Sequence, residues 1–156
     1  AMSSLPGQNS TPLVLAFGCD HAGFPLQQYL MKIAEQHQYV VIDCGTIDQH
    51  SVDYPEFAER VVKKVLEGQA DRGILICGTG IGMNITANRH QGIRAACCYH
   101  PSQAFTARQH NNINILCLGS RVTDEKTALE CLKTFLETSF EGGRHQKRLE
   151  QIDHHR

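Results

Sequence analysis

Five short runs of apolar residues recur along the chain, and within each run the apolar side chains do not alternate strictly with polar ones. A strand that is apolar on both faces is typical of a parallel sheet with helices on either side. Glycine or polar residues follow each run, so we interpret the runs as buried strands. The predicted strands cover residues 13–18, 39–43, 73–77, 92–98 and 113–119.

Segments with helical spacing lie between these strands. Pro55 suits the first turn of one helix, because its fixed φ is helical and its missing N–H has no partner there. Thr123 is a suitable N-cap for another. The predicted helices cover residues 24–37, 55–66, the segment from the turn after Cys77 to about 90, 101–108, the segment from Thr123 through Leu136, and the segment from about Arg144.

The alternation of strands and helices predicts an α/β fold. Parallel strands joined by right-handed crossovers form a three-layer α/β/α sandwich, here with a five-stranded, parallel, Rossmann-like sheet. We expect residues 13–156 to form this single domain and residues 1–12 to be a flexible leader.

Several polar residues stand directly after predicted strands. Ligands of such sheets bind outside the carboxyl ends of the strands. We therefore expect one edge of the sheet to carry all of these residues, namely Asp20, His21, Cys77 to Gly82, Tyr99, His100 and Arg121.

Composition and charge exclude several classes of function. The 15 basic and 16 acidic side chains give a formal net charge of -1, so no broad basic surface favours DNA, RNA or an acidic membrane. No apolar run approaches the ~18 residues of a membrane span, and the N-terminal segment is polar. We expect a soluble cytoplasmic protein.

The cysteines and histidines form no metal-binding pattern. The seven cysteines include no Cys-x-x-Cys pair, and most lie in apolar runs, as small buried side chains of a reducing compartment do. The nine histidines include no His-Glu-x-x-His motif. We expect neither a metal nor another cofactor.

The loop after Cys77 carries glycines at 78, 80 and 82. A dinucleotide-binding loop needs a glycine where Met83 stands, a cysteine phosphatase loop needs an arginine there, and a P-loop needs Gly-Lys-Ser/Thr. None of these three loops fits. The residues still predict a thiol that faces converging N–H groups, which suits a base or nucleophile beside an oxyanion. A small buried cysteine before a tight turn explains the same residues, and the spacing leaves both interpretations open.

Two further groups have both a functional and a structural interpretation. Arg144 and Arg148 lie one helical turn apart, so both guanidinium groups can meet one phosphate, although a solvated charged helix is the commoner case. Asp20 and His21 are either an acid/base pair or a cap followed by a surface histidine.

Taken together, six motifs closely resemble the ribose-5-phosphate isomerase B family, within the wider group that includes galactose-6-phosphate isomerase subunits. They occur in the order of the family and extend from about residue 13 to 150. The motifs are Gly18-Cys19-Asp20-His21-Ala22-Gly23-Phe24, Asp53-Tyr54-Pro55, Cys77-Gly78-Thr79-Gly80-Ile81-Gly82, Arg108-Gln109-His110-Asn111, Gly119-Ser120-Arg121 and Glu141-Gly142-Gly143-Arg144-His145.

The resemblance implies a role for each of these groups in aldose–ketose isomerisation. Cys77 corresponds to the base that moves a proton between C2 and C1, and Thr79 to the hydroxyl that relays a proton between oxygens. His110 corresponds to the residue that opens the furanose ring, with Asp20 beside the ring. Backbone N–H groups from Gly78 through Gly80 and Gly82 to Asn84 bind the enediolate.

The remaining implied residues bind the sugar and its phosphate. Tyr54 lines the sugar pocket, and Asn111 binds a hydroxyl group. The phosphate site corresponds to His21, Arg121, Arg144 and Arg148. Asn84 stands where several relatives carry serine, and the position of Tyr99-His100 varies in the family.

The implied reaction interconverts D-ribose 5-phosphate and D-ribulose 5-phosphate, in the non-oxidative branch of the pentose phosphate pathway, without a metal. A six-carbon substrate, allose 6-phosphate or galactose 6-phosphate, and a non-catalytic sugar-phosphate-binding protein are the alternatives. The resemblance also implies at least a homodimer with the site between subunits and the C-terminal helix packed on the partner, and it leaves a tetramer open.

Overall fold

The computed structural model describes residues 12–154, so all of the predicted leader except Pro12 lies outside the described residues. Its elements alternate as expected. In chain order they are β1 (Val14–Cys19), α1 (Phe24–Gln36), β2 (Val40–Asp43), α2 (Tyr54–Leu66), β3 (Arg72–Cys77), α3 (Ile81–Asn88), β4 (Ala95–Cys97), α4 (Pro101–Asn111), β5 (Ile115–Gly119), α5 (Glu125–Glu137) and α6 (Arg144–Asp153).

The five strands form one parallel sheet in the order β2-β1-β3-β5-β4. The chain passes from β1 outward to β2 and then returns to β3 on the other side of β1. The order of the strands therefore reverses between β1 and β3, and ligands of such sheets bind beside the carboxyl ends at this point. Cys19 and Cys77 end the two strands.

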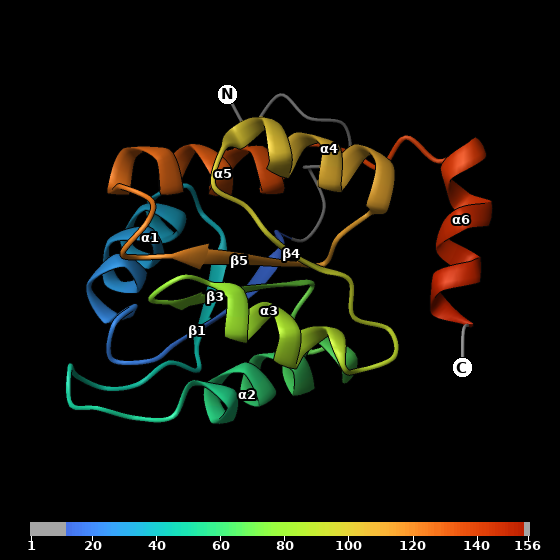
Figure 1. Ribbon diagram of the computed structural model, residues 1–156. Helices are drawn as coiled ribbons and strands as arrows, with labels where there is room; N and C mark the ends of the chain where they lie inside the picture. The colour runs from blue at the N-terminus through green and yellow to red at the C-terminus, as the bar shows by residue number, and fades with distance from the viewer. Residues whose placement is uncertain (1–11, 155–156) are drawn as a thin grey trace.

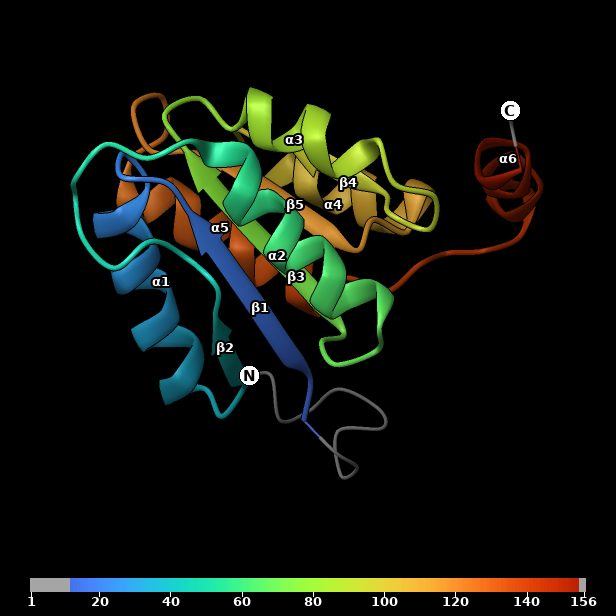
Figure 2. The same ribbon diagram turned by 90° about the horizontal axis from the view of Figure 1, so that it is seen from below.

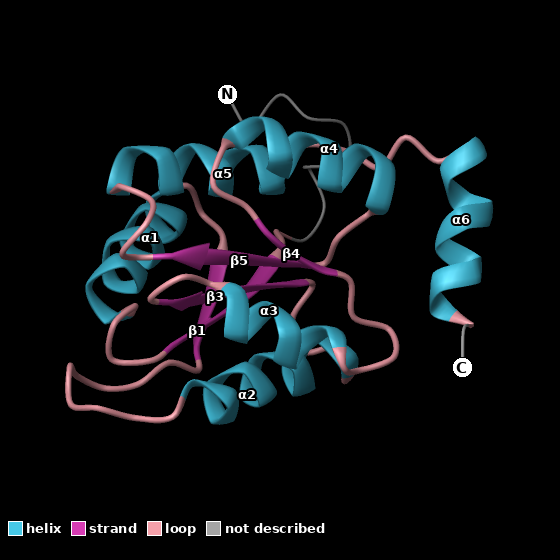
Figure 3. Cartoon of the chain, in the orientation of Figure 1, coloured by secondary structure: helices cyan, strands magenta, loops and turns pink. Residues whose placement is uncertain are grey.

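Helices cover both faces of the sheet (Figures 1 and 3). α1, α4 and α5 enclose a core with Phe17 and Ile76, and α2 and α3 enclose a second core with Ala16 and Leu75. Successive strand residues point to opposite faces, and both faces are buried, which explains the apolar runs without alternation. The predicted three-layer sandwich is confirmed.

The edge strand β4 is shorter than predicted. Gly92 adopts a left-handed φ of 92°, so the chain is still turning there. The N–H of Arg94 then donates to the Asn114 side chain at 2.8 Å instead of a strand carbonyl. Regular pairing therefore begins only at Ala95.

The predicted N-cap Thr123 is wrong by one residue. Asp124 caps α5, because its Oδ1 accepts a hydrogen bond from the Thr127 N–H at 2.8 Å. Asp124 stands three residues before Thr127, which is the separation that a capping side chain needs.

The ends of the helices matter for the site. α4 starts near the carboxyl end of β4 and runs back along the sheet for ~16 Å, so it ends at the opposite, amino edge. α6 follows α5 at this amino edge and lies beside the sandwich, outside both helical layers (Figures 1 and 2). Within residues 12–154, no helix is long and apolar enough to span a membrane.

Candidate active site

Cys77 ends β3 at the carboxyl edge of the sheet. Its side chain is buried, and its Sγ accepts a hydrogen bond from the Gly80 N–H at 3.2 Å. A thiolate accepts such a bond more strongly than a thiol does, so the loop is suited to a negative charge on sulfur.

The neighbouring cysteines have a different environment. Burial raises the pKa of the Cys97 thiol, places that of Cys117 well above its ordinary value, and raises that of Cys98 to about 12. These three groups therefore remain protonated at neutral pH and are poor bases or nucleophiles.

Gly80 determines the shape of the loop around the thiol. Its φ of 83° lies in the left-handed region, where a side chain is strained. A Cβ at this position would also lie 2.8 Å from Cys97 Sγ and 2.9 Å from the carbonyl carbon of Leu118. Glycine thus lets the loop pack against β5 while its N–H points at the sulfur.

Thr79 presents its hydroxyl group beside this loop. Its Oγ1 accepts a hydrogen bond from the Ile81 N–H at 3.2 Å, and its carbonyl accepts one from the Tyr99 hydroxyl at 3.3 Å. The side chain is exposed, so the hydroxyl proton remains available to a ligand.

Arg121 and Tyr54 approach the same loop at two of its glycines. A Cβ on Gly78 would lie 3.0 Å from Arg121 Nη1, and a Cβ on Gly82 would lie 2.5 Å from the Tyr54 hydroxyl oxygen. These two glycines leave room for a guanidinium group and a phenol ring beside Cys77.

Asp20 and His21 follow β1 at the same edge. Asp20 is buried, and its Oδ1 accepts a hydrogen bond from the Gly23 N–H at 3.0 Å. His21 Nδ1 accepts one from the Val52 N–H at 3.1 Å. Because Nδ1 acts as an acceptor, the proton of a neutral ring is on Nε2, which can then donate to an anion.

Two of the predicted enediolate donors have other partners in this structure. The Asn84 N–H donates to the Gly80 carbonyl at 3.0 Å in the first turn of α3, and the Gly80 N–H donates to Cys77 Sγ at 3.2 Å. The side-chain Oδ1 of Asn84 is buried and has no hydrogen-bond partner among the described residues.

A second group of candidate residues lies at the amino edge. His110, near the end of α4, stacks on His145 of α6 with ring centroids 4.3 Å apart. Glu141 Oε1 lies 3.3 Å from His145 Nε2 and 3.5 Å from Arg144 Nη1. Asn111 follows His110 directly, Arg148 lies one helical turn after Arg144, and both side chains are exposed. The amino edge thus carries two imidazoles and two arginines.

The nitrogens of His110 and His145 and a carboxylate oxygen of Glu141 lie within 4.8 Å of one another, close enough to be considered as metal ligands. The two rings are nearly parallel, at 16°, so their in-plane lone pairs do not converge on one point. His110 lies on α4, whereas Glu141 and His145 lie more than 30 positions later, before and on α6, so a search for a ligand motif along the sequence does not find the three together.

The structure therefore divides the predicted site residues into two groups. Those predicted to share the carboxyl edge do so, and their backbones are joined by hydrogen bonds such as Asp20 N–H to Ile76 O and Arg121 N–H to Gly78 O. His110, Asn111, Arg144 and Arg148 lie at the amino edge, and the length of α4 separates them from Cys77. One chain does not bring the two groups together.

Sequence reasoning assigned no role to the two side chains that support these groups, Ser120 and Arg108, although both stand in the motifs. The Ser120 hydroxyl donates to Ala22 O at 2.8 Å and so joins the ends of β5 and β1. Arg108 is buried and donates to Thr138 O at 3.0 Å and Ile113 O at 2.7 Å, which anchors the end of α4 beside His110. Burial lowers the pKa of Arg108 to about 10, which still leaves it charged at neutral pH.

The chain matches a family model described as Ribose/Galactose Isomerase over residues 15–152. It is 45% identical to ribose-5-phosphate isomerase B of Escherichia coli (strain K12) over 138 residues, which are 88% of this chain and 93% of that protein.

Solved structures agree with this match. Ribose-5-phosphate isomerase B of Clostridium thermocellum superposes with a TM-score of 0.89 at 43% identity, covering 90% of this chain and 95% of that one. The Mycoplasma genitalium enzyme of the same name, solved with bound ribulose-5-phosphate, has a TM-score of 0.87 at 38% identity, covering 90% and 93%.

Proposed function

Because the chain belongs to the ribose/galactose isomerase family, we propose that it interconverts D-ribose 5-phosphate and D-ribulose 5-phosphate through an enediolate. The E. coli relative carries this activity in its name, and a structural neighbour was solved with ribulose-5-phosphate. Within this chain, the buried Cys77 thiol with the Gly80 N–H on its sulfur supports the proposal most directly.

Cys77 is the base of this reaction. Its thiolate takes the proton from C2 of the open-chain aldose. The electron pair of the C–H bond forms the C1–C2 double bond, and the π pair of the C1 carbonyl moves onto O1, which gives the enediolate. The thiol then returns the proton to C1, which leaves a ketone at C2 and a hydroxyl group at C1. No redox partner is needed, because the proton and electrons stay within the substrate and the enzyme.

The oxygens of the enediolate need donors at the same place. The N–H groups of Gly78 and Gly82 have no hydrogen-bond partner among the described residues, and they face the charge that develops on O1 and O2. Thr79 relays the proton between the two oxygens, since its hydroxyl proton is available.

Ring opening and phosphate binding require residues from the amino edge. His110 opens the furanose and Asn111 binds a sugar hydroxyl, while Arg144 and Arg148 bind the phosphate with His21 and Arg121. Since one chain separates these groups, we infer a homodimer in which each site combines the carboxyl edge of one copy with the amino edge of the other. Asp20 and Tyr54 then contact the sugar from the side of Cys77.

The same chemistry accommodates a six-carbon sugar phosphate. The test compares turnover of ribose 5-phosphate, allose 6-phosphate and galactose 6-phosphate by the purified protein, with Cys77→Ala as the negative control. We expect the highest kcat/KM with ribose 5-phosphate. A strong preference for a six-carbon substrate would contradict the assignment of ribose 5-phosphate as the substrate. Phosphate binding without turnover of any of the three sugars would contradict the proposal that the protein is an enzyme. We place the reaction in the cytoplasm, where its seven free cysteines remain reduced.

A further inference from the structure

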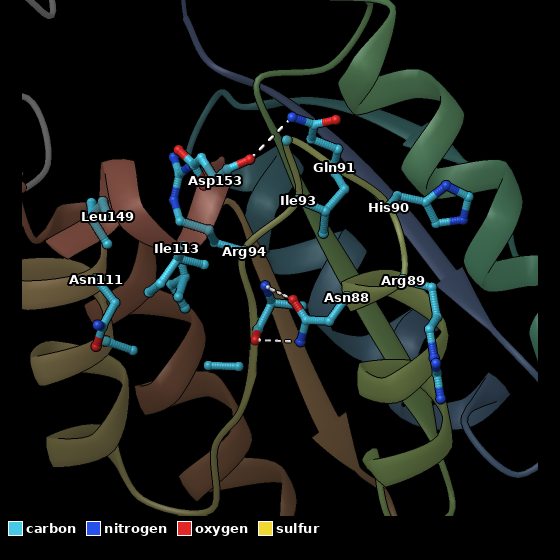
Figure 4. Close-up of a pocket in the computed structure, with 15 residues that line it drawn as sticks. Asn88, Arg89, His90, Gln91, Ile93, Arg94, Asn111, Ile113, Leu149 and Asp153 are labelled. Carbon is cyan, nitrogen blue, oxygen red and sulfur yellow. Dashed lines mark hydrogen bonds and ion pairs between the residues drawn. The ribbon is translucent and has the colours of Figure 1, made fainter. Parts of the chain in front are cut away.

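α6 carries two of the arginines assigned to the phosphate, yet it lies outside the helical layers (Figures 1 and 2). Its attachment to the rest of the chain therefore determines where these arginines point. A cavity of about 560 Å³ lies between α6 and the segment that connects α3 to β4 (Figure 4). Continuous apolar packing does not fill this region, so individual contacts hold the helix.

Three residues of α6, spaced four apart, form one stripe that faces the body of the chain. These residues are His145, which stacks on His110, Leu149, whose side chain is only 3% exposed, and Asp153, which lines the cavity. Residues four apart lie on one face of a helix. Arg144 and Arg148 each precede a stripe residue by one position, so they point ~100° away from the body.

The C-terminal end of this stripe is held by polar contacts. Arg94 Nη1 donates to both carboxylate oxygens of Asp153, at 3.1 and 3.2 Å. Gln91 Nε2 donates to the Asp153 backbone carbonyl at 3.0 Å (Figure 4). This bond satisfies one of the carbonyls that a helix end leaves unpaired.

Arg94 is also held by contacts that do not involve α6. Its Nε donates to Asn112 O at 3.0 Å, and its N–H donates to Asn114 Oδ1. The side chains of Arg94 and Asp153 are only 20% and 31% exposed, so solvent screens this ion pair less than an exposed one.

We propose that Arg94, with Gln91, forms a latch on Asp153 that orients α6 and so positions Arg144 and Arg148 for the phosphate of the substrate. The role in catalysis rests on the proposed function. Asp153, Arg94 and Gln91 touch no reacting atom in this scheme, so they are positioning residues.

The first variant is Asp153→Asn, which keeps the size of the side chain and removes its charge. We expect KM for ribose 5-phosphate and the inhibition constant of inorganic phosphate to rise together, roughly 3- to 10-fold, while kcat changes less than about 2-fold. Glu150→Gln is the matched control, because it removes one negative charge from an exposed position of the same helix. Equal effects of the two variants would overturn the latch.

A double-mutant cycle separates the latch from general destabilisation. Arg94→Gln should resemble Asp153→Asn, and the combined variant should be little worse than either one, because both remove the same contact. The thermal unfolding midpoint should change little. Additive effects, or an unchanged KM in Asp153→Asn, would contradict the proposal.

Hydrogen exchange tests the latch without activity. The amides of residues 144–153 should exchange faster in Asp153→Asn than in the wild type or Glu150→Gln, since the end of the helix is released. If the wild type lacks isomerase activity, the proposed function fails, and exchange together with calorimetric binding of inorganic phosphate still tests the latch. Unchanged exchange and phosphate affinity would overturn it.

Discussion

The Gly80 N–H donates a hydrogen bond to the sulfur of Cys77 at 3.2 Å, at the point where β3 meets the loop before α3. Burial raises the pKa values of the neighbouring Cys97 and Cys117 thiols, so neither is a good base at neutral pH. A backbone N–H that points at the Cys77 sulfur is a strong partner for the thiolate that the proposed base needs.

Replacing the thiol tests its role directly. Cys77→Ala should lower kcat for ribose 5-phosphate by at least about 10³-fold, because it removes the proposed base, while inorganic phosphate still binds. Cys97→Ala, at a nearby half-buried thiol, is the control and should retain most of the activity. Full activity of Cys77→Ala would show that this thiol is structural.

The backbone at Gly80 should tolerate no side chain. Gly80→Ala combines a left-handed φ with a Cβ 2.8 Å from Cys97 Sγ, so we expect a free energy of unfolding lower by about 2–4 kcal/mol, together with loss of activity. Gly68→Ala is the matched control, because Gly68 has a φ of 76° with nothing within 4 Å of its Cβ. It should cost only about 1 kcal/mol in denaturant unfolding. If both variants lose the same free energy of unfolding, a clash of the Gly80→Ala side chain with Cys97 would be excluded as a cause.

Arg144 should affect binding more than chemistry. Arg144→Ala should raise KM for ribose 5-phosphate at least about 10-fold, since it removes a charge-assisted contact to the phosphate. Lys147→Ala removes an equal charge from another exposed position of α6 and should change KM much less. An unchanged KM in Arg144→Ala would place the phosphate elsewhere.

The proposed sharing of each active site between two copies predicts that two inactive variants complement each other. Cys77→Ala and His110→Ala disable opposite edges, so a mixed dimer has one site with both residues intact and one with neither. Random reassembly of equal amounts should restore about a quarter of the wild-type activity, because half of the dimers are mixed. Steady-state assays after joint refolding measure this recovery. No recovery would indicate that each chain contains a complete site.

Buried thiols should weaken the fold at high pH. Burial raises the pKa of Cys19 and Cys98 from 9.0 to about 12, so the native chain keeps protons that the unfolded chain releases. The free energy of unfolding is therefore unaffected by these groups below pH ~9 and falls as the pH rises from ~9 towards 12. Urea titrations at several pH values measure the slope, which Cys98→Ala should reduce. A slope unchanged in this variant would exclude Cys98 as a source.

The sequence determined the layers of the fold and one half of the site. The apolar runs are buried on both faces, as their lack of alternation predicts, and the parallel arrangement follows from the helices between them. Residues directly after strands must meet at one edge, so the neighbourhood of Asp20, Cys77 and Arg121 was predictable.

Local competition decided the details that were predicted incorrectly. Asp124 rather than Thr123 caps α5, and the Asn114 side chain replaces a strand partner for Arg94. Asn84 N–H is used within α3. In each case a backbone N–H donates to a side chain or carbonyl that the pattern of residue types does not predict as its partner.

Only the tertiary structure decided how the proposed catalytic residues are distributed. The strand order placed Cys77 at the reversal between β1 and β3, and the direction of α4 carried His110 to the opposite edge. The sequence contains both residues, but the distance between them depends on how the helix crosses the sheet. Likewise, Arg94 and Asp153 are 59 positions apart and meet only because α6 lies beside the segment that connects α3 to β4. Contacts between such distant segments depend on packing, which local sequence patterns do not specify.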